Sequence, residues 1–273
     1  MSGRAVVLAR GLGKRMRREG PAALDADKEA AASRGLKALM PLRGRPFIDY
    51  AADSLLRAGL RSICLVIAPD ADALRDQARR ISAATGAEVT WAVQQEPRGT
   101  ADAVLAAEAF VAGEPFVLAN GDDLYPQEAL GEMAGKQGPD CWLAAFERDE
   151  MVRQGNVGPE RVRDFAVVAA GPDGRLLNVV EKPTDPERYA QDGRVWVSMN
   201  LYRFTADVFD ACRRVRPHPE RGELELTAAV ADLLERGRPR FRVAFCRGGV
   251  LDLTSRGDVL SAECALAGRD LSF

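Results

Sequence analysis

The sequence predicts an α/β fold in which a mostly parallel sheet lies between layers of helices. Short apolar runs alternate with helical patterns through the first half of the chain. These runs are continuous rather than alternating with polar residues, which is typical of strands covered on both faces. Strands of this kind, separated by helices, indicate a parallel sheet. At 273 residues, one such domain buries most of its apolar surface without disulfides.

The first half alternates regularly between strand and helix patterns. An apolar run at 5–9 predicts a buried strand, and apolar residues at helical spacing predict an amphipathic helix over 47–58. The elements that follow are a strand at 63–68, a charged helix at 70–84, a strand at 88–93, a helix at 100–111 and a strand at 115–119. The stretch 17–36 interrupts a strand-to-helix connection. We therefore expect a mobile segment over a site there, with a short helix within 22–33, rather than part of the core.

The second half is more mixed. Residues 171–174, Gly-Pro-Asp-Gly, are a hairpin turn signal between strands expected at 165–170 and 176–180. The remaining expected elements are strands at 195–204 and 241–245 and helices near 223–236 and 257–268. No linker, low-complexity tract or internal repeat interrupts the sequence, so a single domain over 1–273 is predicted.

The charge balance excludes several classes of partner. The chain has 38 basic and 40 acidic side chains and a formal net charge of -2, whereas a dedicated nucleic-acid binder normally shows a basic excess. No apolar run approaches the ~20 residues of a membrane span. The chain enters an apolar strand at Ala5 without the longer apolar core of a secretion signal. We expect a soluble, cytoplasmic protein that binds neither nucleic acid nor membrane.

Two residue types are scarce. His218 is the single histidine, so neither an imidazole triad elsewhere nor a zinc site of several histidines is available. Only five of the 38 basic residues are lysines, which suggests that a lysine retained here is needed for its compact ammonium group. Lys14, Lys37 and Lys182 fall inside the motifs described below. The five cysteines are widely spaced and are expected to be buried, reduced thiols.

The first predicted strand ends in a glycine loop, residues 9–16, with the sequence Ala-Arg-Gly-Leu-Gly-Lys-Arg-Met. Glycines directly after a strand let the backbone turn sharply and present its N–H groups to an anion. The third glycine of a dinucleotide fingerprint would stand at Met16, so NAD binding is disfavoured. An incidental tight turn would explain the glycines alone. Together with Lys14 and Arg15 they predict a triphosphate cradle.

A lone lysine, Lys37, precedes two prolines, Pro41 and Pro46, that stiffen the approach to a helix. A surface lysine in a rigid loop would be the structural explanation, and the scarcity of lysine makes that explanation weaker.

These motifs resemble the sugar-1-phosphate nucleotidyltransferase family, which makes nucleoside-diphosphate sugars, and in particular its glucose-1-phosphate thymidylyl- and uridylyltransferases. The matching residues are Gly11, Gly13, Arg15, Met16, Lys37, Pro41, Pro46, 94–103, Gly121-Asp122, Glu181-Lys182-Pro183, 222–227 and 251–253. They occur in family order and cover nearly the whole chain. The resemblance implies a Rossmann-like, mostly parallel mixed sheet of the nucleotide-diphospho-sugar transferase type. Its nucleotide-binding half would cover about 1–125 and its sugar-phosphate half about 126–273.

Three departures from the family pattern stand out. Lys14 replaces a small Ser or Thr, and Arg10 replaces a small residue. Residues 198–202, Ser-Met-Asn-Leu-Tyr, stand where many members have Asn-x-Gly-Ile-Tyr. This last change lies in the expected sugar pocket. It therefore puts the identity of the sugar in doubt, but not the type of reaction.

The implied reaction suits a chain with one histidine. A sugar-1-phosphate oxygen attacks the α-phosphorus of a nucleoside triphosphate and expels pyrophosphate. The nucleophile is already an anion at neutral pH, so no general base is required. The reaction does require charge neutralisation between two phosphates that repel each other, and in-line positioning.

The resemblance assigns the triphosphate to the glycine loop. The backbone residues implied are Ala9, Gly11, Leu12 and Gly13. Arg15 would stabilise the leaving pyrophosphate, and Lys37 would contact the α-phosphate or the attacking phosphate as charge develops.

The sugar phosphate is assigned to the second half. Lys182, in the Glu-Lys-Pro motif, would bind the phosphate, and Glu181 and Asn200 are candidates for sugar hydroxyls. Gly155 and Asn156 are expected to bring backbone near the sugar.

Two carboxylates, Asp122 and Asp252, each follow an apolar run and could converge at strand ends on one hard cation. The resemblance places Mg²⁺ there and assigns Gly121 to the nucleotide. A turn or helix-cap aspartate is the alternative for each, and Asp123 is expected to be the structural member of its pair.

The base is expected to face Gln94 and the turn at Gly99 and Thr100. An amide offers one donor and one acceptor, which suits O4 and N3–H of uracil or thymine. UTP or dTTP is therefore favoured, with GTP as the rival.

The leading hypothesis is a Mg²⁺-dependent transferase that joins a nucleoside triphosphate to a hexose-1-phosphate. The alternatives are an enzyme for GTP and mannose-1-phosphate, an enzyme for a non-sugar phosphate, and a non-catalytic paralogue that binds NDP-sugars and regulates a partner. The last would typically have lost the metal carboxylates or the loop arginine, which this chain retains. A homo-oligomer is compatible with the sequence.

Overall fold

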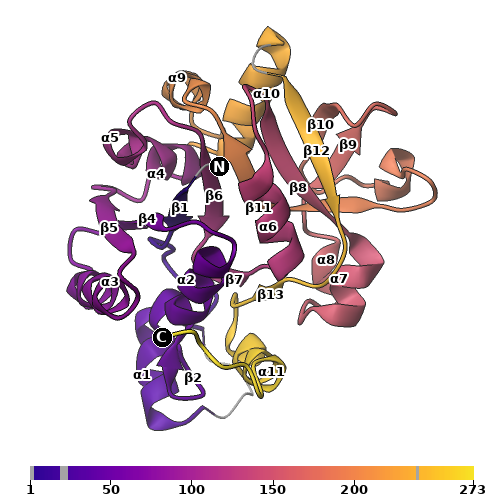
Figure 1. Cartoon of the computed structure of the whole chain (residues 1–273). Coiled ribbons are helices and arrows are strands. Elements are labelled where there is room, and N and C mark those ends of the chain that lie inside the picture. Colours follow the sequence, from indigo (N-terminus) through magenta and orange to yellow (C-terminus); the bar gives the residue numbers. More distant parts are fainter. Residues whose placement is uncertain (1–2, 19–23, 238–239) are drawn as a thin grey trace.

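A mixed sheet of nine strands forms the centre of the computed structural model, which describes residues 3–18, 24–237 and 240–273 (Figure 1). Its strands are β1 (Arg4–Leu8), β4 (Ser62–Ile67), β5 (Glu88–Val93), β6 (Phe116–Asn120), β8 (Cys141–Glu147), β9 (Val167–Ala170), β10 (Leu176–Val180), β11 (Trp196–Phe204) and β12 (Phe241–Cys246). The main path runs β10-β9-β11-β6-β1-β4-β5, and β8 pairs with both β11 and β12. The α/β fold with a mixed, partly parallel sheet is confirmed.

The first half of the sheet is parallel. Strand β1 pairs with β4 on one side and β6 on the other, and β4 pairs with β5, all in parallel. Leu8 lies opposite both Val66 and Asn120, so the loops after β1 and β6 begin at the same level. This is the switch point of a doubly wound sheet, where ligands usually bind. The second half joins through β11, which is antiparallel to β6, β8 and β9.

Helices cover both faces of the sheet. The helices on one face are α2 (Phe47–Arg57), α3 (Asp72–Thr85) and α6 (Gln127–Gly135), and on the other α4 (Thr100–Ala106), α9 (Asp207–Arg214) and α10 (Leu226–Arg236). Successive side chains of β1 point to opposite faces: Ala5 and Val7 belong to the first cluster and Val6 to the second. The expected helix over 100–111 is broken at Ala107, where α5 (Glu108–Val111) follows α4. Among the described helices, none has the length and apolar character of a membrane span.

A third apolar cluster lies at one end of the molecule, where α1 (Ala26–Arg34), β2 (Pro41–Leu42) and α11 (Arg256–Ala265) meet (Figure 1). Ala32 of α1 is fully buried, and Glu29 pairs with the Arg256 guanidinium. The expectation of a mobile segment over 17–36 is therefore wrong for α1, because this helix buries small side chains against α11 and β2. Residues 19–23 of that stretch lie outside the described residues.

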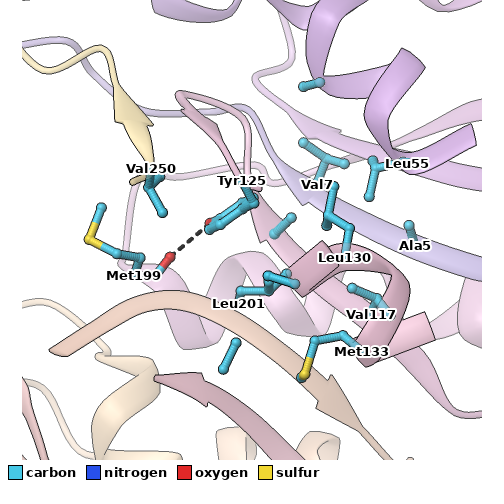
Figure 2. Close-up of a cluster of buried hydrophobic side chains, with 14 of the residues drawn as sticks. Ala5, Val7, Leu55, Val117, Tyr125, Leu130, Met133, Met199, Leu201 and Val250 are labelled. Atoms are coloured by element: carbon cyan, nitrogen blue, oxygen red, sulfur yellow. Dashed lines mark hydrogen bonds between the residues drawn. The ribbon is translucent and has the colours of Figure 1, made fainter. Parts of the chain in front are cut away.

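Tyr125 connects the end of β6 to β11. Its ring is buried in the cluster that Figure 2 shows, and its hydroxyl donates to the carbonyl of Met199 at 2.7 Å. The same hydroxyl accepts the Asn120 N–H at 3.1 Å. A buried phenol with both hydrogen bonds made fixes the two strands relative to each other. These hydrogen bonds anchor the segment that contains Asp122 and Asp123 to β11.

Candidate active site

A cleft of about 400 Å³ opens where β1, β5 and β6 end. Its lining comes from both halves of the chain. The lining residues are Leu8, Arg10, Gly11, Leu12, Gly13, Lys14, Arg15, Lys37, Gln94, Pro97, Gly99, Thr100, Ala103, Asn120, Asp122, Asn200, Glu223 and Thr254. Ala9 and Gly121 line a smaller adjoining cavity together with Lys37 and Asp122. Most of the sequence-predicted nucleotide residues are thus brought together.

The glycine loop is set against the end of α1. Gly13 has a φ of +58°, and a Cβ there would lie 2.5 Å from the carbonyl oxygen of Gly35, which is the C-cap of α1. No other residue fits such an approach. Met16, fully buried, anchors the end of the loop. Lys14 and Arg15, between these fixed points, are exposed and line the cleft.

Lys37 and Asp122 form an ion pair at the floor of the cleft. Lys37 begins a short 3₁₀ turn (Lys37–Leu39), and its Nζ lies 2.7 Å from Oδ2 of Asp122. Burial lowers the pKa of Lys37, but the carboxylates of Asp122, Asp252 and Asp123 outweigh it, so the pKa lies above its usual value. The ammonium group is therefore charged throughout the neutral range.

Asp252 joins this pair through a short antiparallel ladder. Strand β13 (Leu251–Asp252) pairs with β7 (Asp123–Leu124), and the Leu253 N–H donates to the Asp122 carbonyl at 2.9 Å. Burial raises the pKa of Asp252, Arg161 lowers it and Asp122 raises it, with a net rise above its usual value. The two predicted carboxylates therefore lie on neighbouring segments, with Lys37 close to both.

Asp123 is the buried neighbour of this group. Its Oδ2 accepts a hydrogen bond from Asn120 Nδ2 at 3.0 Å and lies 3.2 Å from the Tyr125 hydroxyl, whose single proton it shares with the closer Met199 carbonyl. Burial, Asp252 and Asp122 raise the pKa of Asp123 well above its usual value. Oδ2 thus ties Asp123 to the turn, whereas its buried Oδ1 has no hydrogen-bond partner among the described residues, and the structural role of Asp123 stays a prediction.

Hydrogen bonds fix which atom of the Gln94 side-chain amide is free to face the cleft. Its Nε2 donates to the carbonyl of Gly99 at 3.0 Å and to Oδ2 of Asp102 at 2.8 Å. Because a carboxylate only accepts at neutral pH, Asp102 fixes the amide with its oxygen on the other side. Within the described residues, Oε1 of Gln94 has no hydrogen bond. Gln94 therefore offers an acceptor.

The turn at Gly99 is sealed against the second half of the chain. Gly99 has a φ of +122°, and a Cβ there would lie 2.4 Å from the Leu224 carbonyl oxygen. Two backbone hydrogen bonds close this seam, from Leu224 to Arg98 at 2.7 Å and from Ala101 to Leu224 at 2.9 Å. Thr100 Oγ1 accepts the Leu226 N–H at 2.9 Å.

We expect Gly99→Ala to lower the free energy of unfolding by at least about 2 kcal/mol, because it combines a disfavoured φ with a backbone clash. Urea unfolding measures the change. Gly113→Ala is the matched control: its φ is +83°, but nothing lies within 4 Å of the added Cβ. We expect about 1 kcal/mol there. Equal losses in the two variants would show that the Leu224 contact contributes nothing.

Comparison with known proteins identifies the family. The family model described as "Nucleotidyl transferase" matches residues 31–255. The chain belongs to the nucleotidyl transferase family.

The curated relatives and a solved structure agree with this membership. This nucleotidyl transferase is similar to a glucose-1-phosphate thymidylyltransferase of Actinoplanes sp., with 33% identity over 240 residues, 86% of this chain and 68% of that protein. It is also similar to the UTP–glucose-1-phosphate uridylyltransferase AglF of Haloferax volcanii, with 29% identity over 86% of this chain and 84% of AglF. A crystal structure of UDP-glucose pyrophosphorylase with UDP-glucose has a TM-score of 0.74 at 20% identity, covering 99% of this chain and 100% of that one, which establishes the shared fold.

The predicted sugar residues differ in where they lie relative to the cleft of this nucleotidyl transferase. Asn200 lines it, with a φ of +55°, whereas Glu181 and Lys182 are exposed beyond the end of β10. The Lys182 ammonium lies 3.7 Å from Asp164. Their assignment to the sugar phosphate stays a prediction.

The expectation for Gly155 and Asn156 needs correction. The Asn156 amide accepts the Asp252 N–H at 2.8 Å and donates to the Asp252 carbonyl at 2.9 Å. Gly155 is packed so closely that a Cβ would lie 2.6 Å from the Val250 carbonyl oxygen. Both residues therefore hold the strand that carries Asp252 instead of facing the cleft.

Sequence reasoning did not assign several of the lining residues, among them Arg10, Glu223 and Thr254. Arg10 donates to the Gln95 carbonyl at 3.1 Å beside the predicted base site. Its replacement of a small residue was a usable signal. Glu223 is the second residue of the motif at 222–227, but nothing in the sequence pointed to Thr254.

The donor set at the Asp122–Asp252 pair fits a hard divalent cation. Carboxylate oxygens are what such cations prefer, and a site that shares the cation with substrate phosphates needs only one or two carboxylates. Within residues 3–18, 24–237 and 240–273, no cluster of three or more His, Cys, Asp or Glu could hold a metal by itself. The two aspartates therefore fit a cation that arrives with phosphate.

Proposed function

We propose that this chain transfers the nucleotidyl group of UTP or dTTP to a hexose-1-phosphate, producing an NDP-sugar and pyrophosphate. The observation that carries the proposal is the ion pair of Lys37 and Asp122, which lines one cleft together with the glycine loop and has Asp252 on the neighbouring strand. The names of the Actinoplanes and Haloferax relatives support the same reaction. Residues from about 1–125 would hold the nucleotide and residues from about 126–273 the sugar phosphate.

The reaction needs positioning and charge rather than a base. A sugar-phosphate oxygen forms a bond to the α-phosphorus as the bond to the bridging oxygen of pyrophosphate breaks. Arg15 and the loop N–H groups would take up the charge that develops on pyrophosphate, and Lys37 the charge between the two phosphates. Lys182 would hold the sugar phosphate. The lone histidine, His218, accepts the N–H groups of Glu220 and Arg221 through its Nδ1 and so belongs to a turn.

Mg²⁺ is the cation that we assign to Asp122 and Asp252. When bound there with the α-phosphate, it would neutralise charge at the reacting phosphorus without any proton transfer. Asp122 and Asp252 are the residues that would hold it.

The fixed amide of Gln94 narrows the choice of base. Uracil and thymine carry an N3–H donor that suits its Oε1, and guanine carries N1–H in the same sense. Adenine and cytosine have an unprotonated ring nitrogen at the corresponding position, so they could reach Oε1 only through their exocyclic amino group, in a shifted pose. We therefore expect ATP and CTP to be poor substrates.

Gln94→Leu is expected to raise the KM for UTP and dTTP about tenfold with a smaller change in kcat, because one hydrogen bond to the base is lost. Initial rates over a range of each triphosphate measure it. Asp102→Asn serves as the matched variant: an amide there no longer dictates the orientation of Gln94. In Asp102→Asn we expect the ratio of kcat/KM for UTP to kcat/KM for ATP to fall. An unchanged preference in both variants would remove Gln94 from base recognition.

A pyrophosphate-release screen of the purified protein tests the whole proposal. UTP, dTTP, GTP, ATP and CTP are each combined with glucose-1-phosphate, mannose-1-phosphate and choline phosphate. We expect the highest rates with UTP or dTTP and a hexose-1-phosphate. Release only with GTP and mannose-1-phosphate, only with choline phosphate, or with no pair at all would each reject the proposal in favour of the corresponding alternative.

A further inference from the structure

An arginine from a separate segment holds the second carboxylate of the candidate active site. Arg161 lies in the short helix α8 (Pro159–Val162), which follows α7 (Arg148–Gln154). Its guanidinium makes an ion pair with Oδ1 of Asp252 and another with Oδ1 of Asp258, the latter at 2.6 Å. The arginine side chain is only 22% exposed. A planar guanidinium suits such a bridge, since it can donate in two directions at once.

The far anchor of this bridge is itself fixed. Oδ2 of Asp258 accepts the N–H of Ser255 at 2.6 Å, the N–H of Thr254 at 3.0 Å and the Ser255 hydroxyl at 2.9 Å. The bond from the Ser255 N–H is one half of the capping box that starts α11. Arg161 therefore connects the end of β13 to the first turn of a helix, with little freedom at either end.

The backbone of Asp252 is held from the same segment. The Asn156 side chain makes a hydrogen bond to each side of the Asp252 main chain, at 2.8 and 2.9 Å. Residues 155–162 thus contact Asp252 at its main chain through Asn156 and at its carboxylate through Arg161. We call this segment the Asp252 clasp.

The clasp pairs with only one carboxylate oxygen of Asp252. Arg161 pairs with Oδ1, while the Thr254 side chain, which lines the cleft, gives the Asp252 carboxylate a further hydrogen bond. The single positive charge of Arg161 is shared between Asp252 and Asp258, so the three groups together keep one negative charge. A carboxylate that is oriented by an outer partner but not fully neutralised is how proteins tune a metal ligand.

We propose that Arg161 is a positioning residue that presents the carboxylate of Asp252 to the divalent cation of the reaction. The inference rests on the proposed function, because it takes Asp252 as a cation ligand. It adds a residue outside the cleft to the reaction: Arg161 acts through Asp252 and touches neither substrate.

The test compares Arg161→Gln with a matched control just beyond the clasp, Arg163→Gln. Arg163 is 71% exposed, and its ion pair is with Glu160 at 3.7 Å. Mn²⁺ binding is followed by electron paramagnetic resonance with UTP present and sugar phosphate absent, and half-saturating Mg²⁺ is measured in turnover. Arg161→Gln is expected to weaken Mn²⁺ binding and raise half-saturating Mg²⁺ at least about tenfold. Arg163→Gln is expected to change neither.

Arg161→Lys provides a second test if Arg161→Gln does not fold. Lysine retains the charge but reaches one carboxylate at a time, so we expect an intermediate loss of about threefold in Mn²⁺ affinity, at an unchanged KM for UTP. Wild-type Mn²⁺ affinity in either folded Arg161 variant overturns the inference. Failure of the proposed function looks different: the wild-type protein would then release no pyrophosphate with any substrate pair, whatever its affinity for Mn²⁺.

Discussion

Asp122→Asn is expected to lower kcat for pyrophosphate release about a thousandfold. The asparagine keeps the size of the side chain but removes the negative charge that pairs with Lys37 at 2.7 Å and that we assign to the cation. Losing one preorganised electrostatic partner at a reacting phosphate costs about 10²–10³ in kcat, and loss of a metal ligand adds to this. Rates at saturating UTP, hexose-1-phosphate and Mg²⁺ measure the effect.

The neighbouring carboxyl provides the control for this prediction. Asp123→Asn changes the adjacent residue, whose Oδ2 accepts from Asn120. An asparagine oxygen can accept this hydrogen bond, so we expect kcat within about threefold of wild type. If the two variants lost activity equally, the effect would belong to the turn at the end of β6 and Asp122 would have no special role.

Lys37→Met is expected to lower kcat by about 10²–10³, because a buried ammonium group beside the reacting phosphates acts in a low dielectric. Its pKa is raised in the folded protein, so the stability that it contributes is fully present below the unfolded value of 10.5 and is lost only as the pH rises through the folded value. At pH 7 to 9 the variant should therefore also melt at a lower temperature than wild type. Turnover and thermal melting are measured together.

Lys136→Met is the control for Lys37. Lys136 pairs with Glu132 at 2.8 Å and lies over the Trp142 ring, away from the residues that line the cleft. We expect unchanged turnover and a small loss of stability, since surface ion pairs contribute about 0–1 kcal/mol. Lys37→Arg should recover part of the activity. Wild-type turnover in Lys37→Met would contradict the assignment of this residue to the phosphates.

The parallel half of the fold was predictable because each strand there is a continuous apolar run. Strands β1, β4, β5 and β6 lie within a residue or so of their expected positions. Strand β8 was not predicted: its sequence, Cys-Trp-Leu-Ala-Ala-Phe-Glu, mixes alanines with aromatics and is equally compatible with a buried helix. Its identity as a strand comes from pairing with β11 and β12, which is tertiary information.

The residues of the candidate site also fall into two groups, those that local sequence predicts and those that it does not. Residues that follow strands, such as Gly13 and Asp122, could be placed from local sequence because the sheet delivers them to one edge. Asn156 and Arg161 could not, since their partner Asp252 lies 96 and 91 residues away along the chain. The sequence predicts backbone near the sugar at Asn156, and only the folded chain shows that both sides of its side-chain amide bond to Asp252.

The contact between Gly13 and Gly35 has a mechanical consequence. Two residues without side chains face each other there, so backbone meets backbone with no compressible group between them. A displacement of the end of α1 toward Gly13 would therefore also move the backbone of the glycine loop. A substitution that displaces α1 toward Gly13 would press on the glycine loop, although α1 itself lies outside the cleft.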